Sequence, residues 1–174
     1  MSDKQKLEKL LEPLQTALEL ERKGMQFFRR AAASTKGAVA QKTFEFLAGE
    51  EEKHIERIKQ FYASLAEDGL PQKATQFPSD AQSRLKEFNR VLADLSKTIT
   101  AGTSDVEAYE TALAFENGAE DFYEEQMNLA TDPSVKNFYQ WLIHEEGMHG
   151  ELIKSCLDFV NDPEDWFKRG EKEK

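Results

Sequence analysis

The feature that most constrains this chain is an internal repeat in which corresponding residues lie 95 positions apart. Each half carries one glutamate and, further along, a Glu-x-x-His motif, and the apolar residues around them recur in the same register. The repeat pairs Glu21 with Glu116, Glu51 with Glu146, and His54 with His149. Two helical hairpins with one pattern indicate a duplication, and pairing them produces a bundle with approximate twofold symmetry.

Four segments of the chain have the apolar spacing of long amphipathic helices. The composition agrees, because 32% of the residues are charged and the chain has only 9 Gly and 5 Pro. We therefore predict an all-α four-helix bundle that occupies residues 1–174 as one domain. Its expected parts are a first helical hairpin (4–68), a long crossover (69–102), a second hairpin (103–160) and a short tail helix (161–174).

Three local signals mark the ends of these parts. Thr103-Ser104-Asp105 is expected to cap the third main helix, and Asp132-Pro133 to open the fourth. The crossover contains a further helical pattern from Asp80 to about Thr100. In the tail, Trp166 and Phe167 are expected to pin the segment to the bundle or to a partner subunit.

Polar residues interrupt the apolar stripe of every main helix at one level. The interrupting side chains are Glu21, Glu51, His54, Glu116, Glu146 and His149. A carboxylate buried alone is costly, and no Lys or Arg shares these stripes. Two divalent cations would balance the charge of four glutamates, and carboxylate oxygen with imidazole nitrogen suits iron, manganese or zinc. The sequence therefore predicts a site for two metal ions.

One Glu from each of two helices, with Glu-x-x-His from each of the other two, is the di-iron carboxylate pattern of ferritin-like bundles. Over roughly residues 5–160 the chain resembles rubrerythrin-type proteins. The likeness rests on two segments with a Glu and an aromatic residue two turns later, and on two Glu-x-x-His motifs. These are Glu21–Phe28, Glu116–Tyr123, Glu51-Glu-Lys-His54 and Glu146-Gly-Met-His149.

The resemblance implies a role for each of these residues around two iron ions per chain, with manganese or zinc as substitutes. Bridging carboxylates would be Glu51 and Glu146, and terminal ones Glu21 and Glu116. His54 and His149 would bind one metal each. The aromatic position holds Phe28 in one half and Tyr123 in the other, so Tyr123 is the expected catalytic tyrosine, donating a hydrogen bond or an electron.

Two further features differ from those of rubrerythrins proper. Those proteins usually carry a rubredoxin domain with four cysteines, whereas Cys156 is the only cysteine in this sequence. They also have an extra Glu on the third helix, and here the position three after Glu116 is Ala119. An external electron donor is therefore expected.

Three functions are compatible with the sequence. The first is a non-haem di-iron oxidoreductase, a peroxidase or ferroxidase that reacts with H2O2 or O2. The second is an iron-binding, storage or delivery protein without catalytic turnover, and the third is a purely structural helical module. The resemblance also implies a homodimer.

The net charge of −10 argues against nucleic acid and against an anionic membrane surface as partners. The sequence has no apolar run of membrane-spanning length and no signal-peptide pattern at its start. A reducing cytoplasm is the expected location, because a single cysteine forms no intrachain disulfide.

Several residues near the motifs are expected to have ordinary roles. Glu50 and Glu145 recur in the 95-residue register but point about 100° away from the ligand face, so we expect solvated or entry-path carboxylates. His144 is expected to be exposed or to lie behind the ligands. Trp141 and Cys156 are expected to be core residues.

Overall fold

The computed structural model describes residues 3–70, 74–79, 83, 86 and 105–172, and within these ranges it contains helices and no strand. The all-α class and the four-helix bundle predicted from the sequence are confirmed. The helices are α1 (Asp3–Ser34), α2 (Ala38–Asp68), α4 (Val106–Leu129), α5 (Pro133–Asn161) and α6 (Pro163–Lys172).

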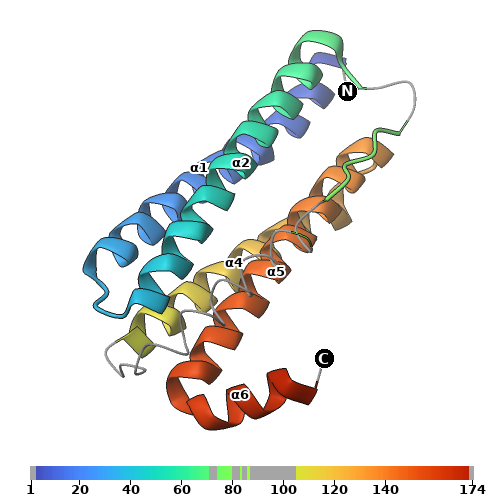
Figure 1. The fold of residues 1–174 in the computed structure, drawn as a ribbon. Helices are drawn as coiled ribbons and strands as arrows, with labels where there is room; N and C mark the ends of the chain where they lie inside the picture. Colours follow the sequence, from blue (N-terminus) through green and yellow to red (C-terminus); the bar gives the residue numbers. More distant parts are fainter. Residues whose placement is uncertain (1–2, 71–73, 80–82, 84–85, 87–104, 173–174) are drawn as a thin grey trace.

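Two antiparallel hairpins form the bundle, as Figure 1 shows. Helix α1 packs along α2, and α4 packs along α5. The hairpins then meet through contacts of α1 with α4 and of α2 with α5. The helical stretch expected between Asp80 and Thr100 falls almost entirely outside the described residues.

Helix α5 begins at the predicted residue, for the predicted reason. The Asp132 side chain accepts hydrogen bonds from the backbone N–H groups of Ser134 (2.8 Å) and Val135 (3.2 Å), and Pro133 occupies the first turn of α5. At the end of α2, Gly69 adopts a positive φ of 75°, a conformation that glycine tolerates without strain.

Asp105 differs from the expectation, because its side chain caps no N–H group of its own helix. It is buried and accepts a hydrogen bond from the backbone N–H of Gly37, at 3.2 Å. A Cβ atom at position 37 would lie 2.4 Å from the Asp105 carboxylate, so a side chain there would displace this carboxylate. The contact joins the turn between α1 and α2 to the start of α4.

The apolar core consists of two clusters at opposite ends of the bundle. One contains Phe28, Phe44 and Phe159 with their neighbours, and the other contains Leu14, Ile58 and Phe138 with theirs. On each of the four main helices, the predicted metal ligands lie between the residues of one cluster and those of the other. The polar level is therefore closed by apolar side chains above and below.

The tail helix α6 turns back at the end of α5 (Figure 1). The Trp166 ring contacts the Phe159 ring at 5.4 Å, and its Nε1 donates to Ser155 Oγ at 3.1 Å. Trp166 thus fixes the tail to the bundle of its own chain. The Phe167 side chain lies outside the described side chains.

Cys156 is buried, as predicted, with its Sγ 3.4 Å from Thr43 Oγ1. Burial raises the pKa of this thiol from 9.0 to about 11, and the neighbouring hydroxyl groups of Thr43 and Tyr109 offset only part of that increase. At pH 8 the thiolate population is then about 100-fold smaller than for an ordinary cysteine.

We predict that Cys156 reacts with an aromatic disulfide reagent at pH 8 at least about 100-fold more slowly in the folded protein than in urea, because thiolate is the reactive form. Release of the coloured thiol measures both rates. Equal rates in the folded protein and in urea would show that the thiol is accessible and ionised in the folded protein. Circular dichroism of the sample without urea checks that this protein is folded.

Candidate metal centre

All six predicted ligands come together at one level of the bundle. One turn of each main helix contributes, and every one of the six side chains is buried. The contributions are Glu21 from α1, Glu51 and His54 from α2, Glu116 from α4, and Glu146 and His149 from α5. The spacing of three residues places each Glu and His of a Glu-x-x-His motif on one helical face.

The six side chains form two overlapping groups, each with the geometry of a cation site. One group is Glu21, Glu51, His54 and Glu146, and the other is Glu51, Glu116, Glu146 and His149. Within each group, one ligand atom per residue lies within 4.8 Å of all the others. Glu51 and Glu146 belong to both groups, so each of these two carboxylates faces both positions.

The two imidazoles present the same nitrogen to the cluster. His54 Nδ1 lies 3.0 Å from Glu21 Oε2 and 3.1 Å from Glu146 Oε1. His149 Nδ1 lies 3.4 Å from Glu116 Oε1 and 3.3 Å from Glu146 Oε2. The two rings are stacked with centroids 5.1 Å apart, so the histidines stand side by side between the hairpins.

Burial perturbs the carboxylates strongly. It raises the pKa of Glu51 well above its ordinary value, and the charges of Glu21 and Glu146 raise it further. Burial and the charge of Glu146 likewise raise the pKa of Glu116. A pair of carboxyl groups with raised pKa values holds protons until a cation replaces them.

The imidazoles compensate for part of this charge. Burial alone would lower the pKa of each histidine, but Glu21 and Glu146 raise the pKa of His54, and Glu116 raises that of His149. Burial would raise the pKa of Glu146, yet the neighbouring imidazoles hold it well below its ordinary value. The carboxylates and imidazoles of the cluster therefore perturb one another in opposite directions.

Several buried polar atoms of this cluster have no hydrogen-bond partner in the structure. They are Glu51 Oε1, both carboxylate oxygens of Glu116, Glu146 Oε1, His54 Nε2 and His149 Nδ1. Buried polar atoms are nearly always satisfied in native proteins, and all of these atoms except His54 Nε2, which faces Glu145, belong to the polar level that the two groups share. Oxygen and nitrogen donors in this arrangement fit a di-iron site.

Comparison with protein families agrees with this geometry. The family model described as Rubrerythrin matches residues 12–157. The chain belongs to the rubrerythrin family. No rubredoxin domain is evident in its 174 residues. Searches of curated proteins and of solved structures returned no match.

The rubrerythrin fold here places the predicted tyrosine against one carboxylate of the cluster. Tyr123 is buried, and its hydroxyl donates a hydrogen bond to Glu21 Oε1. Burial raises the pKa of Tyr123 well above its ordinary value, and the charges of Glu21 and Glu146 add to the effect. The hydroxyl therefore stays protonated and acts as a donor.

The sequence reasoning was wrong about the exposure of Glu50 and Glu145, since both side chains are buried. Glu145 Oε2 lies 3.7 Å from His54 Nε2, and Ser79 Oγ donates to Glu145 Oε1. Glu50 Oε1 accepts from Lys53 Nζ at 2.6 Å. Their recurrence in the 95-residue register was the available signal that the two positions share one environment. His144 is exposed, as expected.

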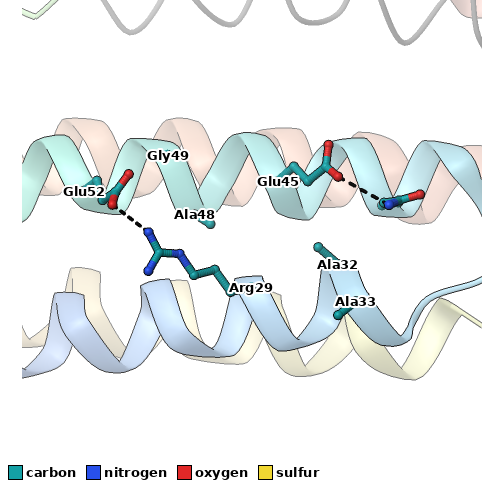
Figure 2. Close-up of a pocket in the computed structure, with 8 residues that line it drawn as sticks. Arg29, Ala32, Ala33, Glu45, Ala48, Gly49 and Glu52 are labelled. Carbon is teal, nitrogen blue, oxygen red and sulfur yellow. Dashed lines mark hydrogen bonds and ion pairs between the residues drawn. The ribbon is translucent and has the colours of Figure 1, made fainter.

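A groove on the surface of this rubrerythrin-family chain lies away from the cluster, on the outer face of α1 and α2. Figure 2 shows small residues such as Ala48 and Gly49 in its wall, with Arg29 reaching across to Glu52 at 2.6 Å. None of the six predicted ligands lines it.

No described helix is both long and apolar enough to cross a membrane.

We predict that Glu51→Ala combined with Glu146→Ala abolishes binding of a metal pair, because these two carboxylates belong to both groups. Helicity should be retained, since the apolar clusters on both sides of the polar level are left intact. Elemental analysis after loading with ferrous or manganous salt and far-ultraviolet circular dichroism provide the two measurements.

The matched control is Glu56→Ala with Glu151→Ala, an exposed pair in the same 95-residue register. It should bind metal like the unaltered protein. Two ions per chain in the Glu51/Glu146 variant would remove the proposed ligand set.

Proposed function

We propose that this protein is a non-haem di-iron oxidoreductase that reacts with hydrogen peroxide or dioxygen. One observation carries the proposal. The protein has two buried groups, each of three carboxylates and one imidazole, and Glu51 and Glu146 belong to both groups. Membership of the rubrerythrin family supports the same conclusion. When bound, two ferrous ions supply the pair of electrons that reduces peroxide or dioxygen.

In this proposal Glu51 and Glu146, which belong to both groups, would hold both metals. Glu21 and His54 complete one site, and Glu116 and His149 complete the other, in agreement with the two groups. Four carboxylates balance two divalent cations, and oxygen with nitrogen ligation also admits manganese or zinc as substitutes.

The surrounding residues control water and protons. The apolar clusters on both sides of the polar level exclude bulk water, which strengthens electrostatic interactions within the site. Tyr123 keeps a proton on its hydroxyl and directs it at Glu21 Oε1, which holds that carboxylate in one orientation. We assign Tyr123 the role of hydrogen-bond donor beside the centre.

Electrons must come from outside these residues if the reaction is to repeat. The chain has one cysteine, Cys156, which is buried beside Thr43 in the core, so no site with four thiolates is present. We therefore propose an external one-electron donor as the partner that returns the centre to its reduced state.

A specific observation favours a second function, iron binding and delivery without turnover. Ala119, which stands where rubrerythrins proper have an additional Glu, is buried in the apolar cluster and offers no ligand atom. A centre without that carboxylate has fewer ways to rearrange between redox states.

The two functions differ in how the reduced centre reacts. For the oxidoreductase we expect anaerobic, Fe(II)-loaded protein to be oxidised by H2O2 and to complete many cycles when a chemical reductant is added. Stopped-flow absorbance of the ferric product and peroxide consumption provide the measurements. A single stoichiometric oxidation, with no further peroxide consumed, would favour iron storage or delivery.

We predict that Tyr123→Phe retains both metals but slows peroxide turnover by about ten- to a hundredfold, the effect of losing one hydrogen bond to a charged group. The matched control is Tyr139→Phe, whose buried ring stacks on Tyr123 at 6.2 Å and whose hydroxyl has no hydrogen-bond partner in the structure. Identical turnover in the two variants would exclude a role for the Tyr123 hydroxyl.

A further inference from the structure

The two nitrogens of His54 face different surroundings. Its Nδ1 points into the cluster, 3.0 Å from Glu21 and 3.1 Å from Glu146. Its Nε2 is buried, has no hydrogen-bond partner in the structure, and lies 3.7 Å from Glu145 Oε2. The ring thus stands between the metal ligands and a second carboxylate that belongs to neither ligand group.

Metal binding would decide which nitrogen of His54 carries the proton. A cation at Nδ1 uses the lone pair of that nitrogen, so the ring proton resides on Nε2 and makes it a donor. A buried donor needs an acceptor, and the structure places Glu145 there. The present 3.7 Å separation exceeds hydrogen-bond length, and a shift of about half an ångström closes it.

Glu145 is itself held by the segment that follows α2. Ser79 Oγ donates to Glu145 Oε1, which leaves Oε2 toward His54. Segment 74–79 is tied to α5, because Thr75 N donates to Ser134 Oγ and Asn137 Nδ2 donates to Thr75 O, both at 2.9 Å.

An aromatic contact anchors the same segment. The Phe77 ring lies 5.0 Å from the Phe138 ring and 5.3 Å from the Phe61 ring, so the segment is packed against both α5 and α2. Ser79 is therefore presented to Glu145 by a fixed stretch of backbone.

The corresponding carboxylate in the first half has a different described partner. Glu50 lies 95 residues before Glu145 and is equally buried, but its Oε1 accepts from the exposed Lys53 at 2.6 Å. The duplication has kept the carboxylate and changed the group that holds it.

We propose that Glu145 is a positioning residue for one of the two metals. It accepts the Nε2–H of His54 and, held by Ser79, fixes the orientation and donor strength of that imidazole. The inference rests on the proposed binding of a metal pair. It makes the two metal sites unequal, with the His54 site dependent on segment 74–79.

The test is anaerobic titration of the metal-free full-length chain with Co(II), followed by calorimetry and visible absorbance. Glu145→Leu should lower the affinity for one of the two Co(II) ions by about 10- to 100-fold and leave the affinity for the other unchanged. Glu145→Gln, which keeps a neutral acceptor, should restore part of the affinity. Ser79→Ala should lower the affinity for the same ion by a smaller factor. Glu50→Gln should leave that affinity unchanged.

A second readout reports on His54 directly. In the Zn(II)-loaded, ¹⁵N-labelled protein, the Nε2–H signal of His54 should be shifted downfield and exchange slowly with water. Glu145→Leu should abolish both properties, whereas a role confined to folding would leave the His54 signal unchanged in the folded fraction.

The outcomes separate this inference from the proposed function. If Glu145→Leu and Ser79→Ala bind both Co(II) ions as tightly as the unaltered chain does, the role of Glu145 is overturned. The proposed dimetal centre then stays in place. Failure of the unaltered chain to bind two ions would overturn both proposals. Should Glu145→Leu not fold, Ser79→Ala decides, because Ser79 is exposed and lies outside the helices.

Discussion

The crowding of four carboxylates at one level of an apolar bundle is the constraint on which the rest of the structure depends. Like charges at this separation repel, and burial removes the water that would screen them. The raised pKa values of Glu51 and Glu116 record that conflict, whereas the lowered pKa of Glu146 records its attraction to the two imidazoles. The proposed pair of cations would offset this repulsion with the same side chains.

The bundle supports this level by surrounding it with apolar layers. Each main helix contributes a polar turn between two apolar stretches, so the core is interrupted once and at the same height in all four helices. Because the flanking clusters carry the packing energy, the polar turn is free to hold groups that would weaken an ordinary core. Asp105 and Gly37 add a direct link between the hairpins at one end.

The sequence predicted the helices and the six clustered side chains because both depend on local periodicity. An inward position on an amphipathic helix follows from spacing alone, as Glu51 and His54 illustrate. The burial of Glu145 did not follow, since it depends on Ser79 and the segment that covers it, which no periodic pattern places. Asp105 was misread for the same reason: its acceptor role depends on a residue 68 positions away.

The duplication explains why the ligands match and also why the two sites need not behave alike. A repeated helical pattern reproduces the residues that point inward, but the neighbours of those residues come from different elements in each half. Tyr123 bonds to Glu21 where the other half has Phe28, and Glu145 is held by Ser79 where Glu50 meets Lys53. Since hydrogen bonds behind a ligand tune the metal that it binds, symmetric ligands in asymmetric surroundings would give the two proposed metals different affinity and reactivity.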